Sequence, residues 1–157
     1  MFFFRNNRSR GGFPHTRPKR GVARLKTLAG IVWASPLSLC GLVLTVPILI
    51  GRGRLCLVQA ETPALLISGR VANYMLARHP FGAMCAMAIG HVVIADRQSL
   101  TPRILTHELA HVRQAAVWGA LFPFAYCASS LWAVMRGRDA YWFNSFEEAA
   151  RREEQQF

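Results

Sequence analysis

The pentapeptide His107–His111, with the sequence HELAH, constrains the fold of this chain more than any other stretch. Residues four apart lie on one face of an α-helix, so its two imidazoles point the same way if the segment is helical. The flanking residues favour a helix over 102–118. Thr101 suits an N-cap, Pro102 suits the first helical position, and Gly119 suits the position after the last turn. We therefore predict a helix of about four to five turns that carries both histidines.

On such a helix, His107 and His111 can hold one Zn²⁺ at about 2.0–2.1 Å from each ring nitrogen. Glu108 is offset by one residue, so it can reach a zinc-bound water without binding the metal and serve as the general base. Gln114 and Trp118 fall on the same helix face as the histidines. The alternative interpretation is a buried helix with two hydrogen-bonded histidines and a surface Glu108.

A catalytic zinc needs a third protein ligand. A further histidine six residues past His111 is excluded, because that position is Val117. Glu147, in the first turn of a second predicted helix, is the favoured third ligand. Glu148 and Asp139 are the alternatives.

The start of that second helix can also be interpreted as a capping box. Asn144 with Glu147, or Ser145 with Glu148, has the required spacing of three residues. The capping and metal-binding interpretations are compatible if Ser145 and Glu148 form the cap while Glu147 binds the metal.

Three stretches together resemble small bacterial zincin-like metallopeptidases of the gluzincin type: residues 107–114 (HELAHVRQ), residues 90–94 (GHVVI) and Asn144-x-Phe146-Glu147. The resemblance covers about residues 52–150. It implies an α+β, zincin-like fold, with a small mixed or antiparallel sheet packed on the HExxH helix and on a downstream helix that carries the glutamate ligand. A small residue, here Ala150, lets the two helices approach. This chain has Ala149 where the family pattern has an acidic residue.

The N-terminal part of the chain predicts a membrane contact. Leu28–Ile50 is a run of 23 residues without a charge, long enough to cross about 30 Å of hydrocarbon as a helix kinked at Pro36 and Pro47. The preceding arm carries eight basic residues and no acidic one, which predicts a cytoplasmic N-terminus in the bacterial inner membrane. We therefore expect a basic, disordered arm (1–26), a hydrophobic anchor helix (27–51) and a zincin-like domain (52–157).

Composition agrees with a membrane-associated protein. The chain is 52% apolar and only 17% charged, with a net charge of +11, whereas soluble domains are about 25% charged. A nucleic-acid partner is not expected, because only the basic arm would support it. The four cysteines show no CxxC spacing, which excludes a zinc ribbon or a redox motif.

A second apolar run, Leu121–Met135, separates the two predicted metal-binding helices. If it crossed a bilayer, His107 and Glu147 would lie on opposite sides and could not share a metal. The run has about 15 residues, fewer than the roughly 20 that a spanning helix needs. We therefore expect a core or interfacial helix here.

The segment between the anchor and the HExxH helix predicts a small sheet. Residues 54–60 and 64–68 have the pattern of a hairpin, residues 70–78 that of a short helix, and residues 87–95 that of one strand. His91 on that strand is expected to be a packed core histidine.

These patterns predict a membrane-associated, zinc-dependent hydrolase that acts on peptides or proteins. His107, His111 and Glu147 would bind one Zn²⁺ per chain, Glu108 would act as the general base on zinc-bound water, and residues 28–50 would contact the lipid membrane. The alternative is a non-catalytic membrane protein whose zincin-like helix is structural or vestigial.

Overall fold

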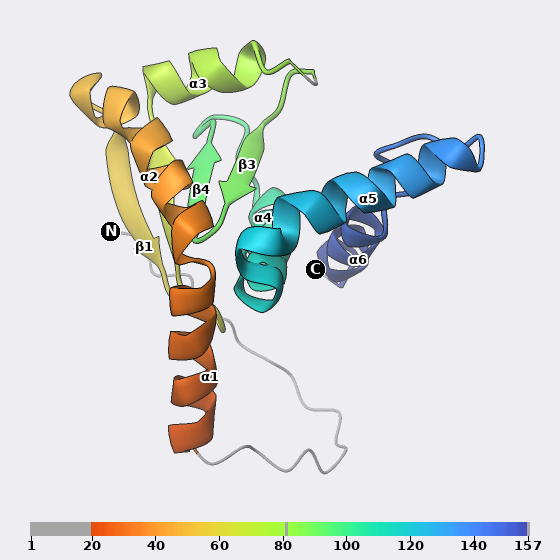
Figure 1. The fold of residues 1–157 in the computed structure, drawn as a ribbon. Helices are drawn as coiled ribbons and strands as arrows, with labels where there is room; N and C mark the ends of the chain where they lie inside the picture. Colours follow the sequence, from red (N-terminus) through yellow and green to blue (C-terminus); the bar gives the residue numbers. More distant parts are fainter. Residues whose placement is uncertain (1–19, 81, 157) are drawn as a thin grey trace.

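A mixed four-stranded sheet in the order β1-β2-β4-β3 lies at the centre of the computed structural model, which describes residues 20–80 and 82–156. β1 (Arg54–Val58) and β2 (Ala64–Ser68) form the predicted antiparallel hairpin. β2 runs parallel to β4 (Val92–Ala95), which pairs antiparallel with β3 (Ala86–Ile89). The fold is α+β with a small mixed sheet, and β3 is the edge strand nearest the HExxH helix (Figure 1).

The prediction of one strand over residues 87–95 is wrong, because the chain turns at Gly90 and His91 between β3 and β4. Gly90 has φ of 60°, in the left-handed region that glycine adopts without steric cost. A Cβ atom on Gly90 would lie only 2.5 Å from the backbone nitrogen of Ser38. Glycine is therefore needed both for the turn and for the close approach of the helix that carries Ser38.

Helices cover both faces of the sheet. α2 (Ser35–Ile50) and α3 (Arg70–Ala77) pack on one face, and α4 (Pro102–Trp118) packs on the other. Side chains alternate between the faces of a strand, so neighbouring residues of β4 serve different cores. The first core contains Ile48, Ile67, Ala72, Leu76, Val92 and Ile94. The second contains Ala64, Val93 and Val112.

The uncharged run 28–50, predicted as one kinked helix, forms parts of two helices. α1 (Arg20–Trp33) and α2 meet at Ala34, with a bend of 67° between residues 27–33 and 35–50. Pro36 stands in the first turn of α2, where it favours the start of a helix. Of the predicted basic arm, residues 1–19 lie outside the described residues, and residues 20–26 belong to α1.

α2 has one protein-facing side and one exposed apolar side. Ala34, Gly41, Thr45 and Ile48 are buried at spacings of seven, four and three residues, which places them on one helix face. After Ser35 at its start, the outer face is exposed and apolar, with Leu39, Val43, Val46 and Ile50. α2 is therefore docked on the sheet and leaves only its outer face for lipid.

By length and composition alone, one continuous helical run within the described residues, Pro102–Met135, could cross a membrane. The bent pair Thr27–Trp33 and Ser35–Ile50 could form a second, broken span. The run 102–135 comprises α4, a 3₁₀ turn at Gly119–Leu121 and α5 (Phe122–Met135). α5 projects away from the sheet, and the chain then returns to α6 (Ser145–Glu154), which packs along α4 (Figure 1). The part of α4 that carries His107 and His111 therefore lies beside α6.

We expect Ile48→Ala to destabilise the protein by about 2–5 kcal/mol, the cost typical of emptying a packed isoleucine site. Ile48 is fully buried in the core beneath α2. Ile50→Ala is the matched control, since Ile50 is 79% exposed, and its expected effect is within about 0.5 kcal/mol. Denaturant unfolding in detergent measures both. Equal losses of stability in the two variants would contradict the docking of α2 on the sheet. The expected difference means that α2 belongs to the core, so that deleting residues 1–51 removes part of it.

Candidate metal centre

The helix α4 positions both histidines as predicted from its flanking residues. The hydroxyl of Thr101 accepts a hydrogen bond from the backbone N–H of Ile104 at 3.2 Å, and Gly119 ends the helix with φ of 58°. His107 and His111 then lie one turn apart, with their Nε2 atoms 3.2 Å from each other. At this distance the two ring nitrogens can share either a proton or a metal ion.

The start of α6 is fixed by Asn144, which is fully buried. Its Oδ1 accepts from the backbone N–H of Phe146 at 2.9 Å, and its Nδ2 donates to the carbonyl of Tyr126 at 3.0 Å and to Ser130 Oγ at 2.8 Å. Of the two caps that the sequence allows, Asn144 is the N-cap, and Ser145 Oγ instead lies 2.9 Å from Ser129 Oγ. Asn144 therefore ties α6 to α5 and sets the position of the first turn of α6.

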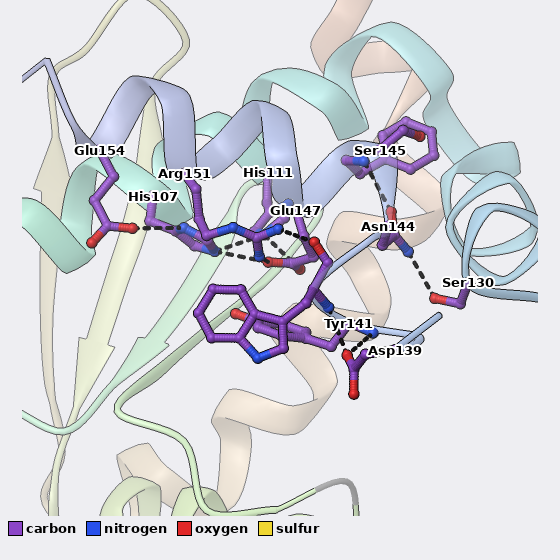
Figure 2. A network of polar contacts seen from close by, with 12 residues as sticks. His107, His111, Ser130, Asp139, Tyr141, Asn144, Ser145, Glu147, Arg151 and Glu154 are labelled. Carbon is purple, nitrogen blue, oxygen red and sulfur yellow. Dashed lines mark hydrogen bonds and ion pairs between the residues drawn. The ribbon is translucent and has the colours of Figure 1, made fainter. Parts of the chain in front are cut away.

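The carboxylate of Glu147, in that first turn, points at the two histidines (Figure 2). Its Oε1 is 3.2 Å from His111 Nε2, and its Oε2 is 3.2 Å from His107 Nε2. These three residues could hold a metal ion, and within residues 20–80 and 82–156 no other His, Cys, Asp or Glu joins them. Glu148 is outside the group. Asp139 accepts the backbone N–H groups of Tyr141 and Trp142 at 2.8 and 2.7 Å and is also outside it.

The facing atoms of this group lie close enough to share one ion. His107 Nε2 and His111 Nε2 are 3.2 Å apart, and each is 3.2 Å from a different oxygen of Glu147, Oε2 for His107 and Oε1 for His111. With one ligand atom taken from each residue, the three atoms lie within 4.8 Å of one another. Glu147 Oε2 is buried and makes no well-oriented hydrogen bond. A cation between the three atoms satisfies all of them.

A second set of contacts orients the two imidazoles through their Nδ1 atoms. His111 Nδ1 lies 2.8 Å from Gln114 Oε1, and Gln114 Nε2 donates to the carbonyl of Phe146 at 3.0 Å. His107 Nδ1 lies 3.3 Å from Glu154 Oε2. A carboxylate can only accept, and Gln114 uses its amide nitrogen on Phe146, so these partners favour a proton on both Nδ1 atoms. In a neutral imidazole held in this way, Nε2 is the nitrogen that can bind a metal, as in metal sites whose histidines donate to outer partners.

Sequence reasoning missed Glu154. It follows Glu147 by seven residues, about two helical turns, so the two residues share a face of α6. Glu154 also pairs with Arg103 Nε at 3.0 Å, which holds the carboxylate in place behind His107. Glu154, in the last turn of α6, therefore places a carboxylate behind His107.

We expect Glu154→Ala to weaken zinc binding by about 10–100-fold, the usual cost of losing a partner behind a ligating histidine. The matched control is Glu153→Ala, which removes a neighbouring carboxylate that pairs with Arg113 and should leave the zinc Kd unchanged. Titration of the metal-free protein with Zn²⁺ against a chromophoric chelator measures both. Equal Kd values for the two variants would show that Glu154 does not act through His107.

Burial and neighbouring charges shift the pKa values of Glu108 and Glu147 in opposite directions. Burial raises the pKa of Glu108, which is 7% exposed, although the nearby histidines and a hydrogen bond from the backbone of Ala88 oppose the shift. Burial acts in the same direction on Glu147, but contacts with His107 and His111 hold its pKa well below the usual range. Glu147 is therefore permanently ionised, as a ligand should be, whereas Glu108 is the stronger base. Two carboxyl groups with opposed pKa shifts are typical of divided roles.

The pKa of His111 reflects two opposed effects. Burial lowers it, but hydrogen bonding and charge attraction from Glu147 outweigh burial and raise it. A protonated imidazole cannot bind a metal, so a proton and a metal ion compete for this nitrogen. Metal affinity at this centre should therefore fall as the pH decreases.

Two tyrosines border the centre as hydrogen-bond donors. Tyr126 OH donates to Glu147 Oε1 at 2.8 Å. Burial and the Glu147 carboxylate raise the pKa of Tyr126 far above its usual value and that of Tyr141 to about 12. Both hydroxyls therefore keep their protons at neutral pH. His91, by contrast, is packed away from the centre as predicted, with Nδ1 3.0 Å from Ser38 Oγ.

The fold and these contacts define an α+β protein with a candidate metal centre of two histidines and one glutamate, built on helices α4 and α6. No protein-family model, curated protein or solved structure matches the chain. Its function is therefore argued from its own residues.

Proposed function

We propose that this protein is a membrane-associated, zinc-dependent hydrolase of the zincin type that cleaves peptide bonds. The observation that carries the proposal is the set of equal 3.2 Å separations among His107 Nε2, His111 Nε2 and the Glu147 carboxylate. Two imidazoles and one carboxylate are a ligand set typical of catalytic zinc with one open position. The outer partners Gln114 and Glu154 support it, since a pair of core histidines has no need of oriented lone pairs.

When bound, Zn²⁺ would polarise the substrate carbonyl and lower the pKa of an attacking water. Glu108 follows His107 directly, so its carboxylate lies beside the ligands without being one of them. It takes the proton of the water during attack and returns it to the leaving amine. The raised pKa of Glu108 brings its basicity closer to neutral pH, which favours both transfers. The O–H groups of Tyr126 and Tyr141, which donate to Glu147 in this structure, are the candidate donors for a developing oxyanion.

The membrane part of the proposal rests on the outer face of α2 and on charge. That face is apolar from Leu39 to Ile50, and the sequence before it holds eight basic residues and no acidic one among residues 1–26. We infer contact of residues 28–50 with the bacterial inner membrane, with the N-terminus in the cytoplasm. A peptide or protein is the proposed substrate.

The proposal is tested by metal content and by a pair of adjacent variants of the full chain in detergent. The wild type should hold about one zinc per chain and hydrolyse a mixed peptide library. Glu147→Ala should weaken zinc binding at least about tenfold, because only two protein ligands remain. Glu148→Ala removes the neighbouring carboxylate and should keep full affinity.

Elemental analysis and chelator competition give both values. A wild-type protein that takes up no zinc from a zinc-containing buffer would overturn the proposal, as would equal losses in the two variants.

A further inference from the structure

The end of the α5 projection and the loop after it form a surface whose residues, apart from Tyr141, have no assigned role at the metal centre. This surface, here named the aromatic tip, comprises residues 131–143, which form the last turn of α5 and the loop that follows it. Trp132 is 55% exposed, Met135 70% and Trp142 61%. Its other exposed large apolar residues are Leu131, Val134, Tyr141 and Phe143. Contiguous apolar surface of this kind is rarely left in water and marks a contact with a partner or with lipid.

The charged groups of the tip indicate which partner. Arg136 lies over the ring of Trp132 at 4.4 Å, and Arg138 lies over Phe143 at 5.1 Å. From α6, Arg151 lies over Trp142 at 4.8 Å. The only acidic residue of the tip, Asp139, is occupied by two backbone N–H groups. Guanidinium groups beside tryptophan and tyrosine are typical of the boundary between hydrocarbon and phosphate headgroups. There the aromatic ring contacts the hydrocarbon and the guanidinium contacts the headgroups.

The return of the chain shows that the tip enters lipid from one side only. α5 has 14 residues and is about 21 Å long, short of the roughly 30 Å of a hydrocarbon core. After the tip, Ser145 and Asn144 bond back to Ser129 and Ser130 of α5. Ser129 and Ser130 of α5 thus face the returning segment. The exposed apolar side chains of α5 are Phe124, Leu131, Trp132, Val134 and Met135. Such a helical hairpin can dip into one leaflet.

We propose that the aromatic tip binds the surface of a bilayer that contains anionic phospholipids, as a contact separate from residues 28–50. Its arginines pair with lipid phosphates while its tryptophans and aliphatic side chains enter the leaflet. A second copy of this chain fits less well, because two tips would bring their arginines together and the chain carries a net charge of +11. Anionic lipid supplies the opposite charge.

This contact also narrows the substrate class, a step that rests on the proposed function. Tyr126, which donates to Glu147, lies on the same helix nine residues before Met135. At 1.5 Å per residue, Met135 lies about 14 Å further along α5 than Tyr126, which contacts the centre. A centre held at that distance from lipid acts on peptide segments that lie on, or emerge from, the bilayer.

The test uses tryptophan fluorescence of the full chain in vesicles. Trp33→Phe and Trp118→Phe are combined, so that emission comes from Trp132 and Trp142 of the tip. Vesicles contain phosphatidylglycerol and phosphatidylcholine brominated at shallow or deep acyl positions. We expect severalfold stronger quenching by shallow bromine than by deep bromine, together with protection from aqueous acrylamide.

Charge reversal gives the matched comparison. Arg136→Glu with Arg138→Glu should reduce bromine quenching severalfold in anionic vesicles, whereas Arg97→Glu, at an exposed turn before α4, should not. Tip tryptophans that stay open to acrylamide and unquenched by bromine would overturn the proposal. Protection from acrylamide that does not depend on lipid charge, together with a dimer in native mass spectrometry, would also overturn it. None of these readouts depends on zinc or hydrolysis, so the tip and the metal centre can fail independently.

Discussion

Glu108→Gln is expected to keep about one zinc per chain and to lower the kcat for peptide hydrolysis by about 10²–10⁴-fold. The amide keeps the size of the side chain, and its oxygen can still accept the hydrogen bond from the backbone of Ala88. It cannot take up a proton in the working pH range, so only the proton transfer is lost. Steady-state kinetics and elemental analysis on the same preparation separate chemistry from binding.

The control for this variant is Glu148→Gln, the same substitution on a carboxylate outside the metal group. It should retain wild-type turnover. Full turnover by Glu108→Gln would remove Glu108 from the mechanism even if zinc were present. Loss of zinc in Glu108→Gln would instead assign it a structural role at the centre.

His111→Ala is expected to abolish stoichiometric zinc binding. The variant leaves one imidazole and one carboxylate, too few to close a tight site, and it strips Gln114 of the partner that aligns it with Phe146. His91→Ala is the matched control, because His91 and His111 are both 9% exposed and only one belongs to the metal group. Zinc per folded chain, measured after gel filtration, should fall to background in the first variant and remain near one in the second. Stoichiometric zinc in His111→Ala would exclude the pentapeptide as the ligand source.

Local signals explain why α4 and the start of α6 could be predicted. Thr101, Pro102 and Gly119 act within one turn of the helix they bound, and the spacing of His107 and His111 follows from helix geometry alone. The favoured placement of Glu147 beside them depended on a family pattern, and the structure brings these residues together. Such features need no knowledge of the rest of the fold.

The features that the sequence did not reveal depend on tertiary packing. Residues 87–95 are nearly all apolar, so periodicity could not show that Gly90 divides them into two strands of opposite direction. The bend at Ala34 has only a weak local signal, the preference of Ser35 for extended backbone before a proline. Glu154 gained its partner His107 only because α6 lies along α4, a contact that no local pattern encodes.

The predicted conflict between a spanning helix and a shared metal is removed by the loop after α5. Pro102–Met135 is long enough to cross a membrane, yet the nine residues 136–144 bring the chain back to Ser129 and Ser130 before α6 begins. His107 and Glu147 come together because the chain reverses direction after α5. This holds whatever the length of the apolar run.

Because of this reversal, a metal ion bound by His107, His111 and Glu147 would close a loop of the chain. The ligands on α4 and α6 bracket α5 and everything that α5 carries, so an ion held between them removes freedom from that loop in the unfolded state as a cross-link does. The coupling between the loop and the ion is reciprocal. Ordering the loop raises its affinity for the ion, and binding the ion raises, by the same factor, the affinity of the loop for whatever orders it. A bilayer that immobilises the end of the loop would therefore act as an effector of the metal centre without touching a ligand.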